Sequence, residues 1–250
     1  MKDVVTVRNL RKSYASPGGA QTTLSGLDLT VREREFLCIL GPSGCGKSTL
    51  VRCIAGFEGY EGEILCNGRP VTGPGSDRIM VFQDYNQLFP WKTVEQNVQY
   101  PLKVRGLRDK AELRRISDAY LRKVGLDGKQ KFYPHELSGG MKQRVAIAKA
   151  LALQPELILM DEPFAALDAI TRNSLQRELQ RISTQEQVTV IFITHNIQEA
   201  ITLGTRVLLM GRDGHIVLDE PNLIPKPVKP SSEGYGAMWD RFSQALEREG

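Results

Sequence analysis

GPSGCGKST, at residues 41–49, is the stretch that decides the fold expected of this chain; it reads Gly41, Pro42, Ser43, Gly44, Cys45, Gly46, Lys47, Ser48 and Thr49. It fits the pattern G-x-x-x-x-G-K-[ST], with a strand-like run before it at 36–40 and a helical run after it at 49–55. In that setting the glycines let backbone N–H groups form an anion-binding nest beside the positive end of a helix. A glycine-rich turn before a buried helix would need neither the lysine nor the hydroxyl. We therefore predict a nucleotide-binding loop, with Lys47 on the β- and γ-phosphates and Ser48 as a ligand for Mg²⁺.

The bulk composition is that of an ordinary globular protein. With 250 residues, 41% hydrophobic and 25% charged, the chain suits one large domain, or one domain with a lobe. No apolar run approaches the roughly 18 residues that span a bilayer, and the N-terminus lacks the apolar region of a signal peptide. We expect any membrane-spanning part to be another chain. The net charge of +4 is mild and does not favour nucleic acid as a partner.

The four cysteines show no C-x-x-C spacing, which favours reduced thiols in a cytosolic protein. Cys45 lies inside the phosphate loop, where the start of a helix could lower its pKa. This predicts that a thiol alkylator inhibits the protein and that ATP protects it. The alternative is that Cys45 is an incidental small residue.

Hydrophobic patterns predict two kinds of β structure. Alternating runs at 4–10 and 24–31, separated by a loop at 16–19, and a short strand at 62–66 predict a small antiparallel layer beside the phosphate loop. Farther along, buried strands alternate with helices, which predicts a mostly parallel sheet covered on both faces. The expected strands are 79–82, 157–160, 188–193, 206–210 and 215–219, and the expected helices are about 138–153, 168–183 and 196–203.

Two further segments have a different character. Residues 94–124 carry charges at helical spacing and predict a helical lobe with breaks near Pro101 and Gly106, its charges forming a solvated face. Residues 221–250 begin with a proline-rich linker and end in a short helix. We expect the apolar stripe of that helix to serve local packing; it consists of Trp239, Phe242 and Leu246.

Polar side chains follow three of the buried strands. Asp161 and Glu162 come directly after 157–160, at the sheet edge where ligands of open α/β sheets bind. Asp161 is expected to bind Mg²⁺, and Glu162 is expected to accept a proton from the attacking water. The strand ending at Gln83 should lie beside them, so that its amide touches the metal or the water. His195 follows the strand 188–194 and is expected to hydrogen-bond the γ-phosphate.

A second anion site is predicted at Ser138, Gly139 and Gly140, which combine a hydroxyl and free N–H groups at the start of a helix. An ordinary helix cap is the alternative, but capping alone does not need two glycines.

In combination, these motifs resemble the nucleotide-binding subunits of ATP-binding-cassette (ABC) transporters. The L-S-G-G-x signature of that family is matched by LSGGM at 137–141, and its Q-loop by Gln83. Its D-loop is matched by residues 166–168, ending at Asp168, and its switch histidine by His195. The aromatic residue that stacks on adenine is matched by Tyr14. The motifs occur in the family's order, which makes the match specific.

The resemblance covers about residues 3–220 and implies an α/β fold with a P-loop (RecA-like), mostly parallel core, a small antiparallel β layer and an inserted helical subdomain. It implies an ATPase domain at 1–220, with the helical subdomain at about 90–153, followed by the linker and helix of 221–250. ATP and Mg²⁺ are the implied cofactors. The implied metal contacts are Ser48, Gln83 and Asp161. The implied catalytic residues are Lys47, Glu162, Gln83 and His195. ATP is implied to contact the loop 41–49 and, outside it, Tyr14, Ser138, Gly139, Gly140 and Asp168.

The resemblance also implies partners and a location. Two copies would form a head-to-tail dimer, in which ATP on Lys47 of one copy is sandwiched by Ser138 and Gly140 of the other. The dimer would work on the cytoplasmic face of the inner membrane with an integral membrane permease, and indirectly with an extracytoplasmic solute-binding protein. Coupling helices of the permease would enter the groove near Gln83 and residues 84–97. Two departures from the family pattern, Ala165 and Asn196, remove no catalytic group.

A finer resemblance concerns the cargo. The segments GPGSDR at 73–78 and LFPW at 88–91 are similar to those of importers for nitrate, sulfonate, taurine and bicarbonate. Importers of thiamine precursors and other aromatic compounds share this pattern, so both cargo classes stay open. A non-transport ABC ATPase is a further alternative, which co-purification with membranes would discriminate. The signature at 138–140 disfavours a P-loop kinase or GTPase.

Overall fold

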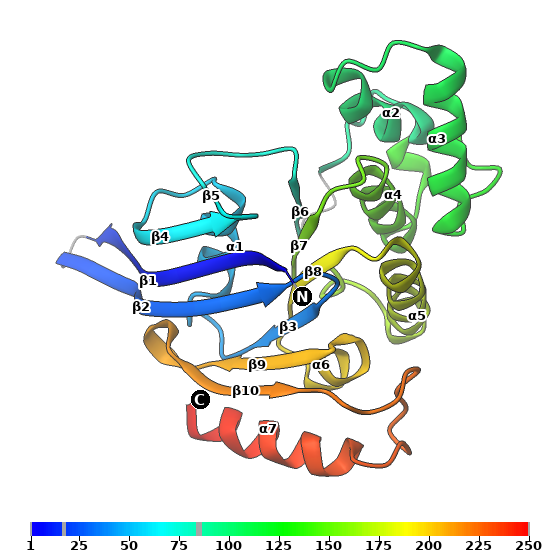
Figure 1. Ribbon diagram of the computed structural model, residues 1–250. Helices are drawn as coiled ribbons and strands as arrows, with labels where there is room; N and C mark the ends of the chain where they lie inside the picture. The colour runs from blue at the N-terminus through cyan, green and yellow to red at the C-terminus, as the bar shows by residue number, and fades with distance from the viewer. Residues whose placement is uncertain (1, 17–18, 84–86, 250) are drawn as a thin grey trace.

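Two β-sheets meet across helix α1 (Lys47–Ala55) in the computed structural model, which describes residues 2–16, 19–83 and 87–249 (Figure 1). The first sheet is antiparallel, with strand order β2-β1-β4-β5. The predicted antiparallel layer is thus confirmed. Its strands are β1 (Asp3–Ser16), β2 (Gly19–Arg32), β4 (Glu61–Cys66) and β5 (Arg69–Pro70).

Strands β1 and β2 are longer than their sequence pattern predicted. They stay paired to the end of a long hairpin, with Ser13 opposite Thr22 and Ser16 opposite Gly19. The outer part of the hairpin is exposed and polar, so it lacks the apolar alternation by which a half-buried strand is detected. Of the loop predicted at 16–19, residues 17 and 18 lie outside the described residues.

The second sheet has strand order β10-β9-β3-β8-β7-β6 and is parallel except for β10, which runs antiparallel to β9. This confirms the mostly parallel core. Its strands are β3 (Phe36–Leu40), β6 (Arg78–Val81), β7 (Leu157–Asp161), β8 (Thr189–Ile193), β9 (Arg206–Met210) and β10 (Ile216–Pro221).

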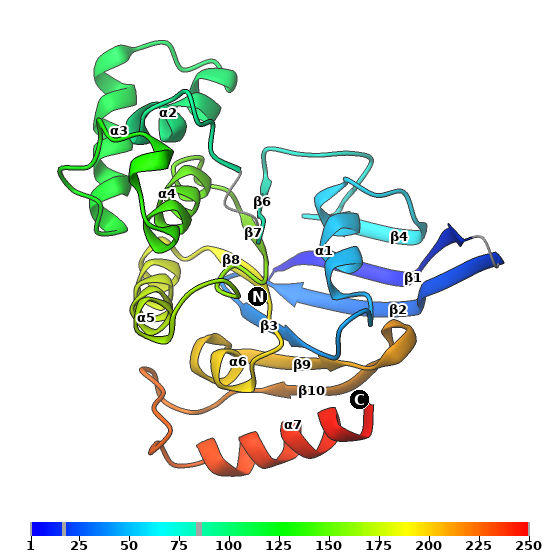
Figure 2. The same cartoon turned by 180° about the vertical axis from the view of Figure 1, so that it is seen from behind.

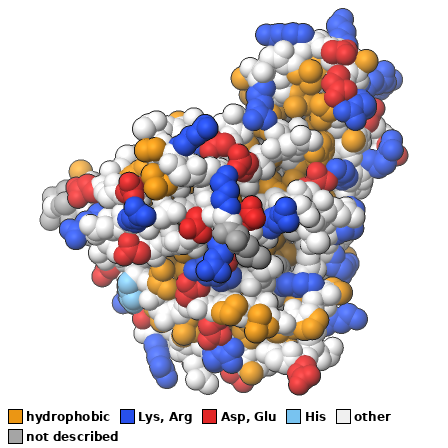
Figure 3. Space-filling view, viewed as in Figure 1, with side chains coloured by type: hydrophobic (Ala, Val, Ile, Leu, Met, Phe, Trp, Pro, Cys, Tyr) orange, Lys and Arg blue, Asp and Glu red, His pale blue; other side chains and the backbone are white. Residues whose placement is uncertain are grey.

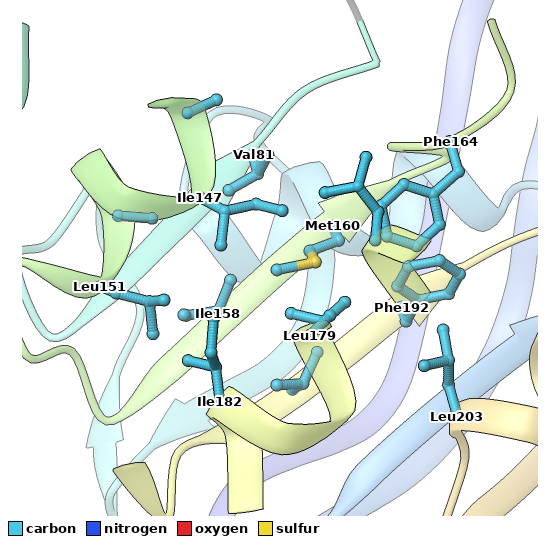
Figure 4. Close-up of a cluster of buried hydrophobic side chains, with 14 of the residues drawn as sticks. Val81, Ile147, Leu151, Ile158, Met160, Phe164, Leu179, Ile182, Phe192 and Leu203 are labelled. Carbon is cyan, nitrogen blue, oxygen red and sulfur yellow. The ribbon is translucent and has the colours of Figure 1, made fainter. Parts of the chain in front are cut away.

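Alternate residues of the parallel strands face two separate hydrophobic cores, because successive side chains of a strand point to opposite faces. Ile39 and Leu159 face the core that holds α1 and the antiparallel sheet. Ile158, Met160 and Phe192 face the opposite core, where Figure 4 shows them packed with side chains of α4 and α5. The helices on that side are α4 (Gly139–Leu151), α5 (Ala169–Glu186) and α6 (Ile197–Leu203).

Helices α2 (Val94–Val104) and α3 (Lys110–Lys123) pack with α4 in a helical lobe that projects from the sheets, as Figure 2 shows from behind. The break expected near Pro101 was wrong, because α2 continues through that residue. Proline costs roughly 3 kcal/mol in a helix interior, but the buried face of α2, with Val98 and Leu102, opposes this cost. The break near Gly106 is confirmed, and this glycine has a φ of 99°.

The C-terminal helix α7 (Tyr235–Glu249) packs against α6, β9 and β10. Phe242 is fully buried, while Trp239 and Leu246 are partly buried against the same core, so the expected local packing is confirmed. Tyr235 and Met238 are also buried in this interface. Within the described part of the chain, no helix combines the length and the apolarity required to cross a bilayer.

Candidate active site

The predicted phosphate loop connects β3 to α1 and lines a cavity of about 220 Å³. Gly46 has a φ of 102° and caps α1, and a Cβ there would lie 2.9 Å from the carbonyl oxygen of Thr23. Only glycine suits both the left-handed backbone and this close approach. The cavity is lined by Thr23, Ser43, Gly44, Gly46, Lys47, Ser48, Thr49 and Glu162.

Lys47 is buried at the base of this loop. Its Nζ donates hydrogen bonds of 2.8 Å to the carbonyl oxygens of both Gly41 and Pro42. These contacts hold a full positive charge inside the loop that presents the N–H groups. The loop is therefore suited to phosphate, the ligand that its sequence pattern predicts.

Cys45 differs from its expected behaviour. It is 3% exposed, and burial raises the pKa of its thiol, although Lys47 at 3.8 Å opposes the rise. The expected lowering of the pKa by the start of α1 was wrong, because desolvation outweighs the nearby positive charge. A raised pKa lowers the thiolate fraction, so it does not favour selective alkylation of Cys45.

Ser48 and Asp161 form a pair of oxygen ligands at the carboxyl edge of the sheet. The Ser48 hydroxyl donates a 2.8 Å hydrogen bond to Oδ1 of Asp161, which is 6% exposed. Burial raises the pKa of Asp161, while Ser48, Arg52 and Lys47 favour its ionised form. Hydroxyl and carboxylate oxygens suit Mg²⁺, which typically takes one or two protein oxygens together with phosphates and water. Residues 2–16, 19–83 and 87–249 contain no cluster of three or more acidic, histidine or cysteine side chains that could hold a metal ion.

Glu162 and His195 face each other from the ends of neighbouring strands. Nδ1 of His195 lies 3.0 Å from Oε2 of Glu162. Glu162 has a φ of 43°, a left-handed conformation that costs a non-glycine residue roughly 1–3 kcal/mol and is frequent at active sites. Its N–H donates to the carbonyl of Ile193 at 3.2 Å, which holds this turn against β8. The structure thus brings together two of the predicted catalytic side chains.

Gln83 lies farther from its strand than expected. Strand β6 ends at Val81, two residues before Gln83, and the Gln83 side chain is exposed. The strand itself is placed as predicted, because it pairs in parallel with β7, with Val81 opposite Met160. Residues 84–86, part of the segment predicted to receive the permease, lie outside the described residues.

Tyr14 reaches the phosphate loop from β1. Its hydroxyl lies 3.4 Å from Oγ1 of Thr49, and the residue is 37% exposed. Nζ of Lys12 lies 4.8 Å from the ring centroid. The aromatic ring therefore lies beside the start of α1, where a base attached to a bound phosphate chain could stack.

Ser138 and Asp168 are helix caps in this structure. Ser138 Oγ accepts from the N–H of Met141 at 3.3 Å, and Asp168 Oδ1 accepts from Ile170 and Thr171 at 3.1 and 3.0 Å. The Thr171 N–H is the largest factor that lowers the pKa of Asp168. Among the described residues, none of Ser138, Gly139 and Gly140 lines the cavity of the phosphate loop. The two predicted anion-binding surfaces therefore remain separate within one chain.

Thr23 lines the phosphate cavity from β2 and was not predicted from the sequence. A buried cluster around Glu199, four residues after His195, was not predicted either. A signal for Glu199 was present, since the N-x-x-E spacing from Asn196 is that of a helix capping box. Asn196 does cap α6, and its Oδ1 accepts from the N–H of Glu199 at 3.2 Å.

Comparison with known proteins shows the family of this chain. The family model described as ABC transporter matches residues 24–165. The chain is 40% identical to the aliphatic sulfonates import ATP-binding protein SsuB of Bacillus cereus, over 98% of this chain and 97% of that protein. It is 44% identical to the bicarbonate transport ATP-binding protein CmpD of Synechocystis, over 88% of this chain and 79% of that protein.

The fold is similar to that of a solved ATP-binding cassette, MJ0796, described as a dimer in a post-hydrolysis state bound to ADP and Pi. The TM-score is 0.77 at 32% identity, covering 87% of this chain and 98% of the other. The α/β fold class predicted from the motifs is therefore confirmed by structure as well as by sequence. This chain belongs to the ABC transporter family, as one of its ATP-binding subunits.

Proposed function

We propose that this protein hydrolyses ATP between two copies of itself and thereby powers uptake of a small anionic solute through a separate permease. The observation that carries the proposal is the 3.0 Å contact between Glu162 and His195, next to the cavity of the phosphate loop. A carboxylate at that place can accept a proton from water that attacks the γ-phosphate, and the imidazole can orient it.

Each remaining group has a separate task in this proposal. Lys47 and the loop N–H groups bind the phosphates, and Tyr14 stacks on the base. Ser48 and Asp161 would hold Mg²⁺, and Gln83 would reach it from the segment two residues beyond the end of β6. When bound, Mg²⁺ supplies positive charge that neutralises charge developing on the phosphates.

A second copy completes the site. Ser138–Gly140 lies apart from the phosphate cavity of its own chain, so it is free to contact ATP held by a partner. The dimeric, ADP-bound state of the related cassette supports this arrangement. Asp168 caps α5. The start of α5 lies against the start of α4, because a Cβ on Gly140 would be only 2.4 Å from Cγ2 of Thr171. Asp168 would therefore approach the partner together with the signature residues 138–140.

The permease would dock in a groove of about 500 Å³ between the sheet and the helical lobe. Apolar side chains dominate its lining, among them Ile79, Met80, Phe82 and Leu153. Figure 3 shows hydrophobic side chains exposed on the lobe and at its junction with the body. Phe82 and Trp91 are exposed by 36% and 69%. An amphipathic helix of a membrane partner fits such a groove, and the protein would then work at the cytoplasmic face of the membrane.

The cargo class rests on relatives, two of which carry names that refer to bicarbonate and to aliphatic sulfonates. The segment 73–78, whose sequence suggested this group, forms contacts within itself. Arg78 pairs with Asp77 at 2.9 Å and donates to the carbonyl of Gly73. The sequence of this segment is thus typical of the subgroup. The permease and the solute-binding protein would select the cargo.

Glu162→Gln tests the catalytic assignment. The change keeps the size of the side chain and removes the base, so ATP hydrolysis should fall by about 10²–10⁴-fold while ATP binding persists. Size-exclusion chromatography with ATP and Mg²⁺ should then show a trapped dimer. A monomer under those conditions would contradict the sandwich arrangement.

The same variant tests transport in cells. Uptake of nitrate, taurine, an alkanesulfonate and a pyrimidine precursor is compared between wild type and Glu162→Gln. Loss of one uptake activity would identify the cargo. Unchanged uptake of all four would reject these solutes while leaving the ATPase assignment intact.

A further inference from the structure

A buried carboxylate lies four residues after the proposed switch histidine. Glu199 is 6% exposed, and its Oε2 accepts a 2.6 Å hydrogen bond from the hydroxyl of Thr194. Its Oε1 accepts from Nε2 of Gln176 at 3.2 Å and lies 3.6 Å from Nε of Arg172. Burial raises the pKa of Glu199, and the hydrogen bond from Thr194, the charge of Arg172 and the hydrogen bond from Gln176 oppose this rise. One carboxylate therefore joins α6, α5 and the end of β8.

The contacts of Glu199 hold the backbone on both sides of His195. The Thr194 hydroxyl donates to Glu199 and accepts from the N–H of Asn196 at 3.0 Å. The N–H of Thr194 donates to the carbonyl of Ile39 in β3. By contrast, the His195 side chain is 62% exposed, so little packing holds it in place. Its position against Glu162 therefore depends on the anchored residues that flank it.

The other end of this network is the segment before α5. Nη2 of Arg172 donates a 2.8 Å hydrogen bond to the carbonyl of Leu167, directly before Asp168. Nε of Arg172 is buried without a hydrogen-bond partner and faces Glu199 only as an ion pair. Arg172 thus spans from the segment 166–168 to the carboxylate that anchors the His195 loop.

We propose that Glu199 and Arg172 are positioning residues that link the segment 166–168 to the loop of His195 and so keep His195 against Glu162. Contact of the partner with 166–168 would then be transmitted to the catalytic pair through Arg172. This inference rests on the proposed roles of Glu162 and His195. A carboxylate that only stabilised the fold would need no connection to that pair.

A double-mutant cycle between Glu199→Gln and His195→Ala tests the link. Glutamine keeps the size and a hydrogen-bond acceptor for Thr194, but it removes the negative charge that faces Arg172. We expect kcat for ATP to fall about tenfold with KM changed less than twofold, since the loop 41–49 is untouched. In the His195→Ala background the same change should have no further effect on residual hydrolysis, measured with γ-labelled ATP.

Two further variants keep the test informative if Glu199→Gln folds poorly. Thr194→Val removes the bridging hydroxyl, and Arg172→Lys keeps the charge but loses the planar group that spans Leu167 and Glu199. Both should lower kcat and not KM. Glu186→Gln is the matched control. Like Arg172, Glu186 lies on α5, and it forms an ion pair with Lys123 away from the site. Its kcat should equal that of the wild type.

The outcomes separate the two proposals. A wild-type rate for His195→Ala alone would refute the catalytic role of His195. If His195→Ala is slow and Glu199→Gln lowers kcat by the same factor in that background as in the wild type, only the link through Glu199 is refuted. Wild-type kcat in Thr194→Val and Arg172→Lys would refute the link as well.

Discussion

Asp161 and Glu162 are neighbours in sequence, yet their carboxylates have different environments. Asp161 ends β7, is almost fully buried and accepts from Ser48. Glu162 turns into the left-handed region, and its side chain lies next to His195 with 24% of its surface exposed. This single change of backbone direction gives one carboxylate a buried environment beside Ser48 and the other a partly exposed environment beside His195.

At the same residue scale, buried thiols predict a loss of stability at high pH. Burial raises the pKa of the Cys53 thiol to about 11 from its ordinary value of 9.0. Between pH 9 and 11 the unfolded chain releases this proton while the native protein keeps it. The free energy of unfolding should therefore fall with rising pH, by up to about 1.4 kcal/mol per pH unit for one thiol.

Urea denaturation of wild type and Cys53→Ala at several pH values checks this. The variant should lose stability less steeply between pH 9 and 11, whatever its stability at pH 7. Parallel curves for the two proteins would show that Cys53 keeps an ordinary pKa.

At the scale of elements, α7 is a structural part of the fold. It covers α6 and the β9–β10 edge, and Arg241 ties it to Glu220 of β10 at 2.9 Å. The linker before it is anchored by Lys226, whose Nζ donates to the carbonyl of Thr202 at 2.8 Å and to that of Gly204 at 2.9 Å, near the end of α6. The tail is thus held at both ends.

Phe242→Ala should reveal this contribution. The side chain is fully buried, so its loss should cost about 3–5 kcal/mol of unfolding free energy. Leu223→Ala serves as the control, because Leu223 is 85% exposed and should change stability very little. Thermal unfolding of the two variants makes the comparison. Equal melting temperatures would mean that α7 detaches without cost to the core.

At the scale of the whole molecule, two half-sites lie on one chain. The phosphate loop follows β3, and the signature begins α4 on the opposite face of the same sheet. Residues 138–140 do not line the cavity of the phosphate loop in the same chain, so in the proposed function a second copy would bring the signature to the ATP. Function is thus expected to belong to the dimer.

Mixing two inactive variants tests the head-to-tail geometry. Lys47→Ala and Ser138→Arg should each abolish hydrolysis alone. In a mixed dimer, the intact Lys47 of one copy meets the intact Ser138 of the other, so random pairing should restore roughly a quarter of the activity. The double variant Lys47→Ala/Ser138→Arg mixed with either single variant should restore none. No recovery in the first mixture would argue against this pairing.

Local signals predicted the phosphate loop, the alternation of strands and helices, and the residues that follow β7 and β8. Each of these features depends on a few adjacent residues, and a parallel sheet brings the carboxyl ends of its strands to one edge. The sequence was less informative where environment outweighs local preference. Pro101 stays within α2, the polar hairpin of β1 and β2 extends past its apolar part, and Cys45 has a raised pKa.

By itself, then, the sequence determined the phosphate-binding chemistry and the class of fold. Only the tertiary structure decided which side chains are in contact: Glu162 with His195, Ser48 with Asp161, and Arg172 with Glu199. The physical reason is that backbone conformation follows from local sterics and hydrophobic periodicity. The strength of a polar contact depends instead on burial, and burial is set by side chains that are far apart in the chain.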